Sequence, residues 1–494
     1  MHDPNITISF TSQDALSTSL QSLLPYLLSV ILLLLPLTTF LRSASPTPLG
    51  CRRLGTPNSN ITDEYDPQYS QGVASDSIDA RTGLPAWRIK ALFTYPIKSC
   101  TGVELDTAEV IDTGLKYDRL FCFAEYIESK PALQDSSSPE SGHWIARTLR
   151  DRHFSRLALL RPEIWIPDPS QADYSSSLPE VQSQGVLVIH YPRTLAGCMA
   201  RIPLMSSFVN LAITLGLLSR EQSFRIPLCP PTLSQKEDEK GEGAGGAKYP
   251  LRPVKIWKDN PLAYDYGHHL PASLRRFLAA AADDNTAKQK PLTLFRECAA
   301  HHRQIFRNAP SKETLGFQTV TGFQDAYPLH MLNLASVHDV ARRCQAEIPR
   351  LTVRRFRANV IVQGPGCFEE DAWRRIRVGG GGRGGTGLKA GAGRVDKEGE
   401  SEGVEIHLAC RTIRCRLPNV DPDTGVRHRS EPDRTMKSYR RIDRGDPTNA
   451  CLGMQLVPAV RNFTLRVNDP ITVLETGEHC YIKMLAPGEV VEGV

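Results

Sequence analysis

The sequence predicts an α+β fold that is dominated by β-barrels and held to a membrane by one N-terminal helix. Short runs with strand-like patterning, bounded by turn-forming residues, recur from residue 87 onward. Helical periodicity is confined to a few segments of the same region. Near the N-terminus, Leu23–Leu41 is an uncharged run rich in Leu and Ile.

We expect Leu23–Leu41 to form a transmembrane anchor. As a helix it would span about 28 Å at ~1.5 Å per residue, close to the ~30 Å thickness of the hydrocarbon core. A cleaved signal peptide would need its basic flank before the apolar run, whereas here Arg42 follows it and Asp3 and Asp14 precede it. The same charge asymmetry predicts that the rest of the chain faces the cytosol.

Composition restricts the class of protein. The net charge of +5 over 494 residues is too small to indicate a nucleic-acid partner. The 12 cysteines lack the regular spacing of a secreted disulfide scaffold, so we expect reduced thiols in a cytosol-facing protein.

Four segments are expected to lie outside the folded core. Residues 1–22 form a polar tail, and residues 42–86, rich in Ser, Thr and Pro, are predicted to form a flexible tether. The insert 235–248 is charged and glycine-rich. A second, disordered insert is expected at 378–404; it resembles a phosphate-binding loop, but no Gly-Lys-Ser/Thr follows its glycines.

Secondary structure is predicted from periodicity. Strands are expected at Arg88–Tyr95, Gly102–Ile111, Asp118–Tyr126, His143–Arg147, Val186–Pro192, Val254–Asp259 and Arg354–Gly364. Helices are expected at Leu270–Ala282 and Tyr327–Ile348, and residues 201–218 are expected to form a buried helix or a strand pair.

The strongest chemical signal is Cys415, which lies between two arginines at the start of a proline-rich turn, Arg414–Gly425. Neighbouring cations favour the thiolate, the form that binds soft metals. The alternating run from Val404 to Cys410 places Cys415 just past a predicted strand end. No second Cys/His pair at zinc spacing accompanies Cys410 and Cys415, and the residues alone leave a structural thiol as the alternative.

Three motifs occur in one characteristic order: YPIKSC (Tyr95–Cys100), FRANVIV (Phe356–Val362) and the RC…VDPDTG…SYR run (Arg414–Arg440). From about residue 87 to 486 the chain thereby resembles the MOSC family, and in particular its membrane-anchored molybdenum enzymes that reduce amidoximes. The resemblance implies an N-terminal MOSC-type β-barrel domain over 87–285 and a MOSC domain over 286–486.

The resemblance also implies roles for individual residues. Cys415 matches the catalytic cysteine that binds molybdenum. Contacts to the molybdopterin cofactor are implied for Lys98, Ser99, Arg119, Arg357, Asn359, Ile413 and Arg414. Arg147 and the segment 325–327 are weaker matches. Ile413 stands where the family often has a small polar residue.

The chemistry of these side chains agrees with such roles. Lys and Arg bind phosphate through charge-assisted hydrogen bonds, and an amide can pair with the edge of a pterin. A thiolate is a soft ligand suited to a sulfur-rich metal site.

The activity implied by the resemblance is reduction of small N-hydroxylated compounds, such as amidoximes and hydroxylamines. The resemblance also implies electrons from a b-type cytochrome and its NADH-dependent reductase. The sequence shows no flavin, haem or nicotinamide motif, so we expect the electron donor to be a separate protein. The mitochondrial outer membrane is the expected location, ahead of the endoplasmic reticulum. The alternative hypothesis is a non-catalytic carrier or binding module for molybdenum cofactor or sulfur.

Overall fold

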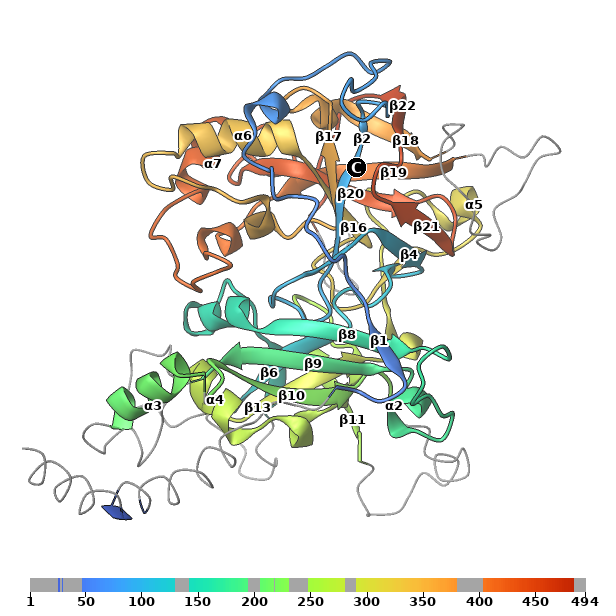
Figure 1. Cartoon of the computed structure of the whole chain (residues 1–494). Coiled ribbons are helices and arrows are strands. Elements are labelled where there is room, and N and C mark those ends of the chain that lie inside the picture. The colour runs from blue at the N-terminus through green and yellow to red at the C-terminus, as the bar shows by residue number, and fades with distance from the viewer. Residues whose placement is uncertain are drawn as a thin grey trace, which may run out of the picture. The chain divides into compact units, whose positions relative to one another are not determined.

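The computed structural model describes residues 25–26, 29, 47–128, 142–193, 205–216, 218–230, 248–279, 290–379 and 403–483. The chain divides into two compact units. The larger comprises Thr47–Tyr191 and Phe224–Val494, and the smaller comprises Met1–Pro46 and Pro192–Ser223. The larger unit contains nearly all of the described strands, which are coloured by position in the chain in Figure 1.

An eight-stranded sheet forms one part of the larger unit. Its strands, in spatial order, are β22 (Ile471–Thr476), β18 (Trp373–Val378), β19 (Val404–Ile413), β20 (Cys451–Pro458), β16 (Leu329–Asn333), β17 (Val360–Gln363), β2 (Arg88–Thr94) and β3 (Val103–Leu105). Only β16 and β17 pair in parallel among these described strands. Figure 1 shows α6 (Leu334–Arg343) and α7 (Asp433–Tyr439) beside this sheet.

The remaining strands form a closed barrel and three smaller sheets. The barrel consists of β11 (Leu251–Lys255), β12 (Leu262–Asp265), β13 (Leu292–Glu297), β6 (Phe121–Ile127) and β7 (His143–Ala146). The first small sheet contains β1 (Cys51–Arg53), β8 (Arg161–Pro167), β9 (Val186–Pro192) and β10 (Glu221–Pro227). The second consists of β14 (Arg303–Gln304) and β15 (Val320–Thr321). The third consists of β21 (Phe463–Arg466), β4 (Thr107–Ile111) and β5 (Gly114–Leu115).

Helices are short and connect the sheets. Among the described residues, the other α-helices are α2 (Pro179–Gln182), α3 (Met205–Thr214), α4 (Ala272–Ala279) and α5 (Lys312–Leu315). The 3-10 helices of the same residues are η1 (Pro67–Ser70), η2 (Arg152–Leu159), η4 (Gly267–His269), η5 (Ala299–His301), η6 (Val353–Phe356), η7 (Glu369–Ala372) and η8 (Leu417–Asn419). The prediction of a sheet-dominated fold with a β-barrel is confirmed.

The helix predicted over Tyr327–Ile348 is wrong in its first part, which forms β16. All five residues of β16 are buried, because the strand lies inside the sheet between β17 and β20. The sequence of this strand, LHMLN, buries polar and apolar residues alike, so it lacks the alternation by which a strand is told from a helix. The helix begins only at α6, where the Asn333 side chain accepts a hydrogen bond from the Ala335 amide.

The strand predicted over Arg354–Gly364 is also shorter than expected. Arg354 and Arg355 belong to η6, Arg357 caps its C-terminal end, and only β17 is extended. Arg354 and Arg355 instead form ion pairs with Asp423 and Asp421, at 2.6 and 2.5 Å. These pairs fasten η6 to the turn that follows Cys415.

The tether predicted over 42–86 is wrong for its described part, which begins at Thr47. Strand β1 pairs with β8, and Ile61 and Tyr69 are buried in the core beside α6. Asp63 forms an ion pair with Lys90 of β2 at 2.9 Å. Paired backbone and buried side chains hold this segment against the sheet, despite its polar composition.

Several predictions fall outside the described ranges. Residues 1–22 are not described, and the inserts 235–248 and 378–404 lie almost entirely in undescribed stretches. Only three residues of the predicted anchor 23–41 are described, so the anchor remains a prediction. Within the described ranges, no helix has both the length and the apolar character needed to cross a bilayer.

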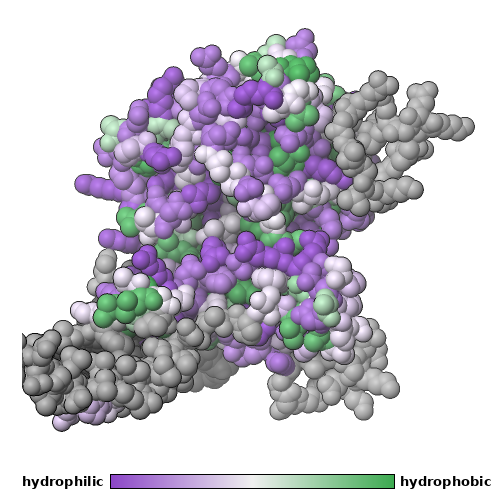
Figure 2. Space-filling view, in the orientation of Figure 1, coloured by the Kyte–Doolittle hydropathy of each residue, from purple (hydrophilic) through white to green (hydrophobic). Residues whose placement is uncertain are grey.

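The sheets cross the domain boundary predicted at 285/286. Strands β2 and β3 from the first half join the eight-stranded sheet, while β13 from the second half completes the barrel. Side chains from both halves can therefore meet at one place. On the face in Figure 2, hydrophilic residues cover most of the described surface and hydrophobic residues form small separate patches.

Candidate active site

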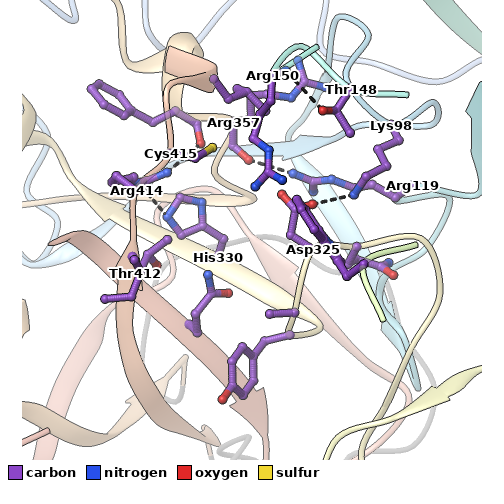
Figure 3. Close-up of a pocket in the computed structure, with 18 of the residues that line it drawn as sticks. Lys98, Arg119, Thr148, Arg150, Asp325, His330, Arg357, Thr412, Arg414 and Cys415 are labelled. Carbon is purple, nitrogen blue, oxygen red and sulfur yellow. Dashed lines mark hydrogen bonds and ion pairs between the residues drawn. The ribbon is translucent and has the colours of Figure 1, made fainter. Parts of the chain in front are cut away.

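One cavity of about 700 Å³ gathers residues from both halves of the chain. Every site residue predicted from the sequence lines it: Lys98, Ser99, Arg119, Arg357, Asn359, Ile413, Arg414 and Cys415. Figure 3 shows five of these with labels, together with several residues that the sequence did not indicate.

Cys415 lies two residues beyond β19, as predicted, and its free thiol is half-buried at the cavity wall. The Arg414 amide donates to the carbonyl of Ala450 at 2.8 Å, which fixes the chain just before the cysteine. The predicted turn also forms, since the Asp421 carboxylate accepts from the amides of Asp423 and Thr424.

Arg414 is buried beside the cysteine, and its guanidinium N–H groups donate hydrogen bonds to other groups of the chain. Its guanidinium donates to the carbonyl oxygens of Leu452 and Phe356, at 2.8 and 3.3 Å, and to Nε2 of His330 at 2.7 Å. Burial lowers the pKa of Arg414 to about 10, so the group stays charged at neutral pH. It therefore shapes the cavity wall.

His330 is neutral in this arrangement. Burial and the nearby charges of Arg414 and Arg119 hold the pKa of His330 well below its usual value. Its Nε2 accepts the hydrogen bond from Arg414, which places the ring proton on Nδ1.

Arg119 and Arg357 share one aromatic ring. Each guanidinium carbon lies 4.5 Å from the centroid of Tyr95, a distance suited to cation–π attraction. Arg119 donates to both carboxylate oxygens of Asp118, at 2.7 and 2.6 Å, and to the Arg357 carbonyl at 2.9 Å. Arg357 donates to the Cys100 carbonyl, and burial lowers the pKa of Arg357 to about 10.

Three of the predicted site residues adopt left-handed backbone angles. Ser99, Arg119 and Arg357 have φ values of 71°, 48° and 57°. A residue with a side chain avoids this region, at a cost of order 1 kcal/mol or more each. Such residues cluster at functional sites, so their convergence on one cavity supports a functional cavity.

Lys98 carries a buried ammonium group within the cavity. It donates to Asp325 Oδ1 at 2.6 Å and to the Phe323 carbonyl at 2.8 Å. Burial lowers the pKa of Lys98, although Asp325 opposes this effect. Burial alone would raise the pKa of Asp325, but Lys98 and Arg119 lower it. Because the Asp325 side chain is 59% exposed, solvent screens this pair.

Ser99 and Asn359 already have partners in the chain. The Ser99 hydroxyl accepts from the Leu149 amide at 3.2 Å. The Asn359 amide group donates to the Phe93 carbonyl at 3.1 Å, and its oxygen accepts from the His330 amide at 3.2 Å. Of the weaker candidates, the segment 325–327 lines the cavity, whereas Arg147 lies outside it and pairs with Glu125 at 2.5 Å.

Sequence reasoning missed Thr412. The β19–β20 register shifts between Arg411 and Ile413, and both Thr412 and Ile413 line the cavity. The Thr412 Oγ1 atom is buried and has no hydrogen-bond partner among the described residues. An unpaired buried hydroxyl is costly, so this atom is a candidate contact for a ligand. The irregular register could not be read from the sequence.

Sequence reasoning also missed the mouth of the cavity, where Arg150 and Trp257 are exposed lining residues. The Arg150 guanidinium carbon lies 3.7 Å from the Trp257 ring centroid. The strand predicted over Val254–Asp259 ends at Lys255, and Trp257 belongs to the turn that follows. No motif in the sequence marks these two residues as neighbours.

The cavity suits an anionic ligand, one end of which can bind the thiol of Cys415. Its lining contains eight Lys or Arg side chains and two carboxylates. Cys415 supplies a sulfur atom, and Thr412 supplies an unused hydroxyl. A cofactor with a phosphate tail and a soft metal matches this donor set. The described residues contain no cluster of three His, Cys, Asp or Glu side chains arranged to hold a metal.

Two family models match the chain. Residues 318–489 match the MOSC domain, and residues 86–167 match the MOSC N-terminal beta barrel domain. The chain is therefore a member of the MOSC family, as its motifs predicted. Within that family it resembles the amidoxime-reducing components.

The relatives are similar over part of their length. "Mitochondrial amidoxime-reducing component 1" of Mus musculus is 30% identical over 158 residues, which cover 31% of this chain and 38% of the relative. "Mitochondrial amidoxime reducing component 2" of Rattus norvegicus is 32% identical over 121 residues, covering 24% of this chain and 28% of the relative. Component 1 of Homo sapiens is 28% identical over 155 residues, 31% of this chain and 38% of the relative. The match thus spans well under half of each relative.

Proposed function

We propose that this chain is an oxidoreductase that uses a molybdenum–molybdopterin cofactor to reduce N-hydroxylated compounds such as amidoximes and hydroxylamines. The observation that carries the proposal is the single cavity in which Cys415 lies among cationic side chains from both halves of the chain. The names of the relatives, amidoxime-reducing components, support the choice of substrate class.

The proposed roles follow from position and charge. Cys415 would hold the metal through its sulfur, and Lys98, Arg119 and Arg357 would attract the phosphate tail. The hydroxyl group of Thr412 would donate a hydrogen bond to the same phosphate tail. When bound, the cofactor would supply the two-electron redox chemistry that removes oxygen from nitrogen.

The buried residues around Cys415 would keep the site rigid. Arg414 fixes the loop through two carbonyl oxygens and orients His330. The His330 ring cannot donate from Nε2, because that atom accepts the Arg414 proton. The ion pairs from Arg354 and Arg355 would hold the turn after Cys415 at a fixed position.

We further propose that electrons come from a b-type cytochrome and its NADH-dependent reductase. Residues 23–41 would anchor the enzyme in the mitochondrial outer membrane, with the cavity facing the cytosol. The mitochondrial relatives favour this membrane over the endoplasmic reticulum.

Metal analysis tests the proposal directly. Full-length protein and its Cys415→Ala variant would be purified, and molybdenum and pterin measured. We expect the wild type to hold molybdenum and Cys415→Ala to lose most of it. Cys480→Ala is the matched control, because Cys480 is a free, exposed cysteine outside the cavity. Retention of molybdenum by Cys415→Ala would contradict the proposed metal ligand.

Turnover separates the enzyme from the alternative carrier. With the cytochrome and reductase present, cofactor-loaded protein should consume NADH when benzamidoxime is added. Protein that is loaded with cofactor but gives no NADH consumption would favour a non-catalytic carrier.

A further inference from the structure

The mouth of the cavity carries an arginine that stacks on an indole and whose side chain has no hydrogen-bond or ion-pair partner among the described residues. Arg150 lines the cavity, and its guanidinium carbon lies 3.7 Å from the centre of the Trp257 indole. Its guanidinium makes no hydrogen bond or ion pair with any described residue; the one hydrogen bond of Arg150 runs from its backbone amide to the Thr148 hydroxyl, at 3.1 Å. Other arginines of the cavity, such as Arg119 and Arg414, are used by the chain itself.

Trp257 occupies an unfavourable backbone position. Strands β11 and β12 are joined through a tight turn in which Ile256 and Asp259 exchange two backbone hydrogen bonds, at 2.9 and 3.0 Å. Trp257 is the first residue between them and has φ of 56°. Glycine is usual at such a position, and a bulky residue there stores strain. Strain of this kind points to a function for the indole.

The turn is fastened to the cavity wall. Asp259 forms an ion pair with the buried Arg303 at 3.3 Å. Arg303 also donates to the carbonyl oxygens of Gly322 and Gln324, next to Asp325. The indole is thereby held beside Arg150. The turn lies within residues 168–317, which fall outside both family matches.

We propose that Arg150, backed by Trp257, is a substrate subsite that binds a carboxylate group. An arginine held against an aromatic ring keeps its edge N–H groups free, and this planar fork matches a carboxylate in two parallel hydrogen bonds. Lys258, the next residue of the turn, also lines the mouth and adds positive charge. The preferred substrates would be N-hydroxylated compounds that also carry a carboxylate. This inference rests on the proposed reductase function.

Paired ligands test the subsite without turnover. 4-Carboxybenzamidoxime, a homologue with a propionate tail, and their methyl esters would be titrated calorimetrically into cofactor-loaded, oxidised full-length protein. We expect at least one acid to bind about five-fold more tightly than its ester. Arg150→Gln should remove this difference and leave ester binding within about two-fold, while Arg150→Lys, which keeps the charge but loses the fork, should keep part of it.

Arg152→Gln is the matched control, because Arg152 is an exposed arginine two residues away that does not line the cavity. It should bind acid and ester as the wild type does. Equal binding of acid and ester by the wild type, at both tail lengths, would overturn the subsite. Loss of pterin from Arg150→Gln would also overturn it and would assign Arg150 to the cofactor phosphate. Turnover of the neutral ester reports separately on the proposed reductase, so the two failures are distinguishable.

Discussion

The cavity has two regions that use arginine in opposite ways. The inner wall, formed by His330, Arg357 and Arg414, is buried. Its guanidinium groups donate hydrogen bonds to backbone carbonyl oxygens and to the His330 ring. The outer rim, formed by Arg150 and Trp257, is exposed, and its guanidinium has no described hydrogen-bond acceptor. A buried cation must be satisfied by the protein, whereas an exposed one remains available to a ligand. The inner wall therefore builds the site, and the rim keeps a cation available to a ligand.

Removing an inner-wall cation should have the largest effect on stability. Arg414→Met would leave the buried Leu452 carbonyl and His330 Nε2 without their donor. We expect the free energy of unfolding to fall by about 3 kcal/mol. Urea denaturation of the cofactor-free protein measures this. Arg416→Met is the control, since that side chain is 72% exposed and should change stability by about 0.5 kcal/mol or less. Equal losses of unfolding free energy in Arg414→Met and Arg416→Met would contradict the contrast between buried and exposed arginines.

A buried carboxyl group outside the cavity shows how missing hydrogen bonds affect the stability of the fold. Glu370 accepts from Asn333 at 3.0 Å through Oε2, but its Oε1 has no partner among the described residues. Burial, and then the charge of Asp371, raise the pKa of Glu370 from 4.5 to about 7. The folded state binds this proton more tightly than the unfolded state, so stability contributed by the protonated group is lost as pH rises from about 4.5 through 7.

Glu370→Gln should therefore flatten the pH dependence of stability. The loss attributable to Glu370 is of order 3 kcal/mol, at about 1.4 kcal/mol per pKa unit. Unfolding free energies between about pH 5 and pH 8 should fall less steeply in the variant than in the wild type. Glu369→Gln, a neighbour that is exposed, should keep the wild-type slope. An unchanged slope in Glu370→Gln would exclude this carboxylate as the cause.

Thr412 tests whether an unused buried hydroxyl in the cavity serves a ligand. Thr412→Val keeps the shape and removes an Oγ1 atom that lacks a described partner. We expect the cofactor-free protein to be unchanged or more stable by up to about 1 kcal/mol, and the cofactor to dissociate faster during gel filtration. Equal cofactor retention with raised stability would show that the hydroxyl contacts no ligand.

Trp257 at the rim should give the smallest change in stability, and in the opposite direction to Arg414. Trp257→Gly relieves an unfavourable φ of 56°, so we expect a gain of about 0.5–1 kcal/mol together with loss of the preference for carboxylated ligands. Asn462→Gly is the control, since exposed Asn462 has a similar φ of 57° that asparagine tolerates. A destabilised Trp257→Gly protein would show that the indole mainly supports the fold.

Much of the site was predictable because short motifs carry local chemistry. YPIKSC, FRANVIV and the Arg414–Cys415 pair each fix residue types at fixed spacing, and the family they indicate supplied the remaining positions. Segments whose structure depends on distant partners were predicted less well. Residues 329–333 became a strand because β17 and β20 flank them, and residues 47–86 are ordered by pairing with remote strands.

The sequence by itself determined the family, the β-rich class and eight of the residues that line the cavity, among them Arg357 and Arg414 but not His330, because these depend on local patterns and motif order. Only the tertiary structure decided that Arg150 meets Trp257, that Thr412 is buried without a partner, and that the buried arginines are satisfied by carbonyl oxygens. These are relations between atoms far apart in the chain. They follow from how the two sheet systems close around one cavity, which no single stretch of sequence encodes.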